Sequence, residues 1–145
     1  MRKRSRISIT VDADNLILII RLHNLRDDQD EPADLIDMLK TVESPWLYRA
    51  IFDFRRYQAD LSRDYLAFLT QKWMALSDGR DQDQAMALIA NTPKLRMNLK
   101  AMTDVMPDRR IAVFETFDEG LDWLKSDSYG CAVAAYAHIN QTLRA

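Results

Sequence analysis

Apolar and polar residues alternate at the start of this chain and then change to a spacing typical of helices. Residues 6–11 alternate with a period of two, which predicts a half-buried strand. Residues 16–22 are more continuously apolar and predict a second strand. The acids and the amide of residues 12–15 between them favour a turn. These segments together predict an antiparallel hairpin at the N-terminus.

Beyond the hairpin, apolar residues recur every three or four positions, which is typical of amphipathic helices. We expect helices after Pro32, from about residue 57 or 61 to Ser77, after Thr92 and after Thr116, with short strands over 47–54, 85–90 and 110–114. The longest helix carries large side chains along one stripe, and we expect Phe68, Leu69 and Trp73 to be mostly buried. Met102 and Met106 are expected to face the core from the next helix.

Strands that alternate with helices predict an α/β fold whose sheet is mostly parallel, because each crossover helix must cover a face of the sheet. The initial hairpin makes the sheet mixed. We therefore expect a mixed sheet of about five strands with four to five helices. The length of 145 residues suits a single domain over 1–145, with a basic start at 1–5 and an extra C-terminal helix within 128–145.

Composition and charge exclude several classes of protein. The net charge of −2 provides no overall positive field, so we expect no nucleic-acid partner. No apolar run approaches the roughly 20 residues of a membrane helix, and the basic start lacks the apolar stretch of a signal peptide. The single cysteine, Cys131, is compatible with a reducing compartment. We expect a cytoplasmic protein without stable membrane insertion.

Residue patterns that carry catalysis are missing from the sequence. The three glycines do not form a phosphate-binding loop. Two histidines and one cysteine, far apart in sequence, do not give the spacing of a metal site. We therefore expect no catalytic residues, no metal and no cofactor, and hence a protein that is not an enzyme.

Polar residues follow the strands that we expect to be parallel, and ligands of open α/β sheets gather outside the carboxyl ends of such strands. Two adjacent arginines near a helix N-terminus suit a carboxylate or a phosphate. The alternative is a polar rim made of exposed side chains and helix caps. The candidate residues for binding a ligand or partner are Asp53, Arg55, Arg56, Asn91, Thr92 and Thr116.

Two stretches resemble the STAS family, the sulfate transporter and anti-sigma-factor antagonist domains. Residues 50–54 resemble the family's third strand, and residues 110–124 resemble its final strand and helix. The resemblance implies a SpoIIAA-like fold over roughly residues 6–126. It also implies a phosphoacceptor at Ser62, although neither a second serine nor a glycine follows it here. The alternative for Ser62 is a helix cap or an exposed helical residue.

Two hypotheses about function follow. The first is a regulatory or protein-interaction module of STAS-like type, which docks a protein partner. The alternative is a carrier that binds an apolar or anionic small molecule between sheet and helices, since STAS-like domains resemble lipid-transfer domains. A large apolar cavity under the long helix would favour the carrier, and a filled core with an exposed apolar patch would favour docking. The segment 128–145 either covers the domain's own core or pairs two copies as a homodimer.

Overall fold

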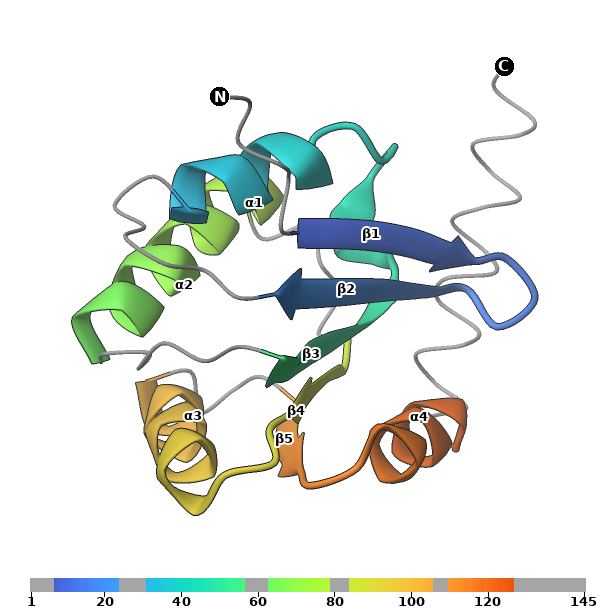
Figure 1. Ribbon diagram of the computed structural model, residues 1–145. Coiled ribbons are helices and arrows are strands. Elements are labelled where there is room, and N and C mark those ends of the chain that lie inside the picture. Colours follow the sequence, from blue (N-terminus) through green and yellow to red (C-terminus); the bar gives the residue numbers. More distant parts are fainter. Residues whose placement is uncertain (1–6, 24–30, 57–62, 79–83, 106–109, 127–145) are drawn as a thin grey trace, which may run out of the picture.

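The computed structural model describes residues 7–23, 31–56, 63–78, 84–105 and 110–126, which form a five-stranded sheet with helices on both faces (Figure 1). The strands are β1 (Ile7–Asp12), β2 (Ile17–His23), β3 (Arg49–Arg56), β4 (Met86–Ile89) and β5 (Ile111–Phe114). The helices are α1 (Glu31–Leu39), α2 (Arg63–Ser77), α3 (Pro93–Val105) and α4 (Phe117–Lys125), and a short 3₁₀ turn covers Pro45–Leu47. None of these helices is long and apolar enough to cross a membrane.

The spatial order of the strands equals their order along the chain. β1 and β2 form an antiparallel hairpin, and β2, β3, β4 and β5 then run parallel to one another. In the hairpin turn, the carboxylate of Asp12 accepts hydrogen bonds from the backbone N and the side-chain Nδ2 of Asn15, at 3.2 and 2.9 Å. The expected α/β class, mixed sheet and N-terminal hairpin are confirmed, with four helices in the described residues.

Side chains that alternate along the strands build two apolar layers. Leu18 and Ile20 of β2 and Phe52 of β3 point toward α1, α2 and α3, which lie on one face of the sheet (Figure 1). Ile51 and Ile89 point to the opposite face, where α4 packs. Since both faces of β3 are covered, its first six residues are all buried. This strand therefore positions groups of either face deep in the molecule.

Gly120 lets α4 approach the sheet closely. A Cβ atom at this position would lie 2.4 Å from Cδ1 of Ile89 and 3.3 Å from Cδ1 of Ile51. Arg49, which is 1% exposed, fixes the end of the same helix. Its guanidinium donates hydrogen bonds to the backbone carbonyls of Leu124 in α4 and Asn15 in the hairpin turn. The helix, the hairpin and β3 are thus joined through one buried side chain.

The expectation that Phe68 is buried is wrong, because this side chain is 45% exposed. The inner face of α2 carries Leu66, Thr70 and Trp73, each of which is buried. Phe68 follows Leu66 by two residues, a rotation of about 200° around the helix, and so lies on the solvent side. There the ammonium of Lys72 lies 5.2 Å from the centre of its ring.

The other expectations for the helices have mixed outcomes. Trp73 is 9% exposed, as expected, and Leu69 is half-buried. The helix expected near Pro32 is α1, and it ends at Leu39. After this residue the backbone tightens into hydrogen bonds from Thr41 N to Met38 O and from Val42 N to Leu39 O. The side chains of Met102 and Met106, the start at 1–5 and the segment 128–145 lie outside the described residues.

Candidate functional site

Charged side chains gather where β2 and β3 end, on the face of the sheet that α4 covers. Asp53 of β3 is 5% exposed. Arg55 binds both of its oxygens, with Nε 2.9 Å from Oδ1 and Nη2 2.9 Å from Oδ2, and the backbone N of Arg55 donates to Oδ1 at 3.0 Å. Nε of Arg21 on β2 lies 3.7 Å from Oδ2. The buried carboxylate is therefore paired with two guanidinium groups.

These contacts keep Asp53 ionised. Burial by itself raises the pKa of the Asp53 carboxyl, but the hydrogen bonds from Arg55 and the positive charges of Arg55 and Arg21 together outweigh it. The pKa of Asp53 consequently lies below its ordinary value. The hydrogen bond to Asp53 raises the pKa of Arg55, with the negative charge of Asp118 contributing.

An aromatic ring completes this group. Phe117, the first residue of α4, has its ring centre 5.4 Å from Cζ of Arg21 and 5.4 Å from Cζ of Arg55. Cations at this separation from a ring are attracted by its electron-rich face. We call Arg21, Asp53, Arg55 and Phe117 the edge cluster. It provides fixed guanidinium groups with side chains 38% and 41% exposed, which suits recognition of a carboxylate or another acceptor.

Of the residues expected at this edge, the structure brings three together. Asp53 and Arg55 form the ion pair, and Nδ2 of Asn91 donates to the backbone carbonyl of Arg55 at 3.5 Å. Arg56 is exposed at the end of β3. Ser62 lies outside the described residues.

The two expected threonines serve as helix caps. Thr92 Oγ1 accepts a hydrogen bond from the backbone N of Leu95 at 3.3 Å, at the start of α3. Thr116 Oγ1 accepts from the backbone N of Glu119 at 3.2 Å, and its hydroxyl donates to Glu119 Oε1 at 2.8 Å. Both hydroxyls thus hold the start of a helix, which is the alternative considered for these positions.

Sequence reasoning named neither Arg21 nor Phe117 as a site residue. The position of Arg21 near the carboxyl end of a predicted strand could have indicated a site residue. Placing it beside Asp53 also requires the pairing of β2 with β3, in which Arg21 lies opposite Asp53. Phe117 joins the cluster only because β5 brings the start of α4 to the same edge.

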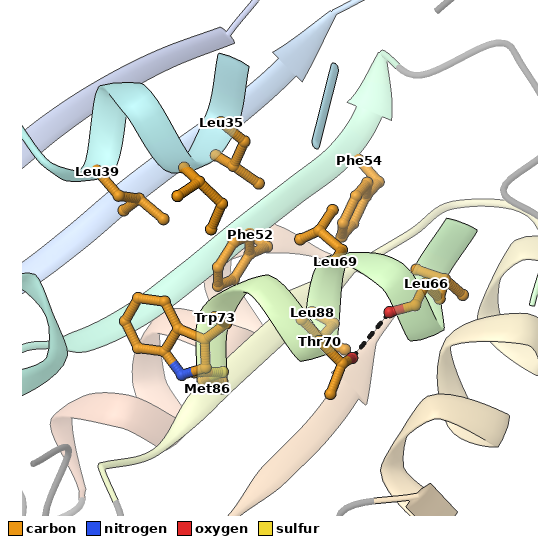
Figure 2. A pocket seen from close by; sticks show the side chains of 11 residues that line it. Leu35, Leu39, Phe52, Phe54, Leu66, Leu69, Thr70, Trp73, Met86 and Leu88 are labelled. Atoms are coloured by element: carbon orange, nitrogen blue, oxygen red, sulfur yellow. Dashed lines mark hydrogen bonds between the residues drawn. The ribbon is translucent and has the colours of Figure 1, made fainter. Parts of the chain in front are cut away.

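A second feature is an apolar pocket between α1, α2 and the sheet, on the face opposite the edge cluster (Figure 2). Its cavity volume is about 40 Å³, and it is partly open to solvent. The side chains that line it come from α1, α2, β3 and β4, and they are Leu35, Ile36, Leu39, Phe52, Phe54, Leu66, Leu69, Thr70, Trp73, Met86 and Leu88.

Two polar atoms belong to the lining residues' side chains. Thr70 Oγ1 donates to the backbone carbonyl of Leu66 at 2.8 Å, one turn earlier in α2, as the dashed line in Figure 2 marks. Nε1 of Trp73 is buried and has no hydrogen-bond partner among the described residues. A buried donor that is left unpaired costs free energy on the order of 1–3 kcal/mol. Since this N–H is buried and the hydroxyl is bonded within the helix, the wall that faces the pocket is almost entirely apolar.

No family model matches this chain, and no curated protein matches its sequence. In the part of the chain that the structure describes, no three histidine, cysteine, aspartate or glutamate side chains gather in a way that could hold a metal ion.

Proposed function

We propose that this protein is a binding module for a small apolar molecule, which it holds in the pocket between α1, α2 and the sheet. The observation that carries the proposal is the pocket itself. Protein interiors are close-packed, and few voids larger than a water molecule occur in a domain. A single water needs roughly 10–15 Å³ and two to four polar partners, so a hollow with this apolar wall favours an apolar occupant over water.

The position of the pocket also supports binding. It lies under α2, the longest helix described, and between layers that come from distant parts of the chain. Small-molecule sites are typically concave and mostly apolar, with few polar groups. The STAS-like order of elements is in keeping with this proposal, because the resemblance implies kinship with lipid-transfer domains.

Native mass spectrometry of the purified protein tests the proposal first, since it detects a retained small molecule. A titration then uses ethylbenzene, a compact hydrocarbon, followed through the indole N–H resonances in nuclear magnetic resonance spectra. We expect saturable binding that shifts the resonance of Trp73 more than those of Trp46 and Trp123, which do not line the pocket.

Two matched variants of α2 locate the binding site. Leu69 and Leu76 are both half-buried leucines that pack against the same core, but only Leu69 lines the pocket. Leu69→Phe should fill the hollow and weaken binding of ethylbenzene at least tenfold, whereas Leu76→Phe should leave it nearly unchanged. Equal effects of the two variants, or no saturable binding to the native protein, would contradict the proposal.

A second candidate function is docking of a protein partner through the edge cluster. The observation that favours it is that Arg21 and Arg55 remain partly exposed while Asp53 and Phe117 hold them in place. Groups held in position before binding lose little conformational entropy on association. A polypeptide retained in native mass spectra, lost in Arg21→Ala and kept in the control Arg56→Ala, would support docking. Its retention in both variants would place the partner elsewhere.

A further inference from the structure

We propose that the edge cluster binds a carboxylate on an acidic segment of a protein partner, and that Arg21 is the residue that contacts this carboxylate. The proposal rests on the second candidate function, docking through the edge cluster, and it names the chemistry of the partner's surface. It is independent of binding in the apolar pocket, whose lining includes none of the edge-cluster residues.

The first step of the argument concerns which groups of the edge cluster face solvent. The side chain of Asp53 is 7% exposed, whereas the side chains of Arg21 and Arg55 are 38% and 41% exposed. The negative charge is therefore buried, and a molecule that approaches this edge meets the two guanidinium groups first. Complementary charge favours association, so this surface suits an anionic group rather than a cationic one.

The second step concerns the donors that remain available. Arg55 binds both oxygens of Asp53 through Nε and Nη2, each at 2.9 Å. The Nε of Arg21 lies 3.7 Å from Oδ2 of Asp53, which is longer than a hydrogen bond. Among the residues that the structure describes, Nη1 and Nη2 of Arg21 have no acceptor. These two donors lie in one plane and match the two oxygens of a carboxylate.

The third step concerns what holds Arg21 in position. The ring centre of Phe117 lies 5.4 Å from its Cζ, and the charge of Asp53 attracts its Nε. A guanidinium that is held in place before binding loses little conformational entropy on association. Arginine and aromatic residues are also enriched in protein–protein interfaces, where lysine is depleted. The edge cluster therefore has the composition of a docking surface.

The fourth step concerns the size of the partner. The two guanidinium groups lie at an exposed edge of the sheet and not in the pocket. At such exposure one ion pair changes an affinity by only about two- to fivefold. A free carboxylate or phosphate ion has no further atoms to make contacts around this pair. A polypeptide does, and we therefore assign the carboxylate to an acidic segment of a protein.

The probe for this proposal is a hexaglutamate peptide with an acetylated N-terminus and an amidated C-terminus. Nuclear magnetic resonance spectra at low ionic strength follow the arginine Nε–H resonances as the peptide is added. Hexaglutamate should bind saturably and shift the resonance of Arg21 more than that of Arg56, which lies outside the edge cluster. A hexaglutamine peptide and inorganic phosphate, at the same ionic strength, should each bind at least about fivefold more weakly.

Matched variants locate the contact. Arg21→Lys keeps the charge and removes the planar pair of donors, so it should weaken binding of hexaglutamate about two- to fivefold. Arg56→Lys, the control at the end of the same edge, should leave binding unchanged. Asp118 is an exposed acid whose charge acts on Arg55, and Asp118→Asn should therefore tighten binding. Asp122→Asn removes the same charge one turn further along α4 and should have a smaller effect.

Urea midpoints establish that the variants are folded, and the Arg21 resonance of the native protein provides the test should Arg21→Lys fail to fold. Equal effects of Arg21→Lys and Arg56→Lys, or equal affinity for hexaglutamate and phosphate, would overturn the proposal. Absence of peptide binding, together with a polypeptide that native mass spectra show to be lost in Arg21→Ala, would overturn it and leave docking through the edge cluster standing. Retention of that polypeptide in Arg21→Ala would contradict docking itself.

Discussion

The close approach of α4 to the sheet can be tested by adding one methyl group at Gly120 and removing another across the contact. In Gly120→Ala the new Cβ would meet Cδ1 of Ile89 at 2.4 Å, well inside ordinary van der Waals contact. Ile89→Val removes that Cδ1 atom. The double variant should therefore tolerate the alanine that the single variant does not.

The magnitudes follow from competing effects. Alanine in place of glycine within a helix stabilises it by about 1 kcal/mol. Forcing an extra methyl group into a packed core costs about 1–3 kcal/mol, so Gly120→Ala should lower the free energy of unfolding by up to about 2 kcal/mol. Ile89→Val alone should cost about 0.5–1.5 kcal/mol. The free energy of unfolding of the double variant should be about 1–2 kcal/mol higher than the value expected if the two losses simply added. A coupling energy of this size is typical of residues in contact.

Urea unfolding of the four proteins, followed by circular dichroism, provides the free energies for this cycle. Thermal midpoints should follow, at roughly 2–4 °C per kcal/mol for a chain near this size. Ile51→Val serves as the control, since Cδ1 of Ile51 lies 3.3 Å from the position of the new Cβ and should couple by less than about 0.5 kcal/mol. Additive effects for Gly120 and Ile89, within about 0.5 kcal/mol, would refute the reasoning.

Three further predictions concern stability. Because the pKa of Asp53 is lower in the folded than in the unfolded protein, the ionised carboxylate stabilises the fold above the ordinary pKa of 3.8, and this effect is lost as the pH falls through the folded pKa. Asp53→Asn should therefore lower the urea midpoint at pH 7 and reduce the fall of that midpoint below about pH 4. Parallel pH profiles of the urea midpoint for the two proteins would contradict this. Arg49→Met should lower the free energy of unfolding by about 1.5–3 kcal/mol for each of the two hydrogen bonds that its guanidinium donates to backbone carbonyls. An unchanged urea midpoint would show that these bonds do not matter. Phe68→Ala should lower the free energy of unfolding by less than about 1 kcal/mol, and Trp73→Ala should lower it by about 3–5 kcal/mol. Similar losses in the two variants would contradict the observed orientation of α2.

Much of the architecture follows from local pattern. The alternation in residues 6–11 and the polar turn after it predict the hairpin, and the structure has the strands within about a residue of those bounds. Thr92 and Thr116 indicate the starts of α3 and α4, because a hydroxyl at these positions binds the backbone N–H groups of the first turn. Such signals act over three or four residues and can be read without knowing the fold.

Side-chain orientation on a helix was predicted less well. The stripe through α2 placed Phe68 and Trp73 together, but the actual inner face includes Thr70 and excludes Phe68. A spacing of threes and fours is compatible with more than one face when apolar residues are frequent. The packing of α2 against α1 and the sheet selects one of these faces, and that selection depends on tertiary contacts.

The binding features depend most strongly on tertiary structure. The apolar run before them predicts that Asp53 and Arg55 lie where a buried strand ends, and residues two apart along a strand share a face. Arg21 reaches Asp53 only through the register of β2 on β3, and Phe117 reaches both arginines only because β5 brings α4 to that edge. The pocket likewise arises from how α1 and α2 pack on the sheet, since a void is the space that side chains from distant segments leave unfilled.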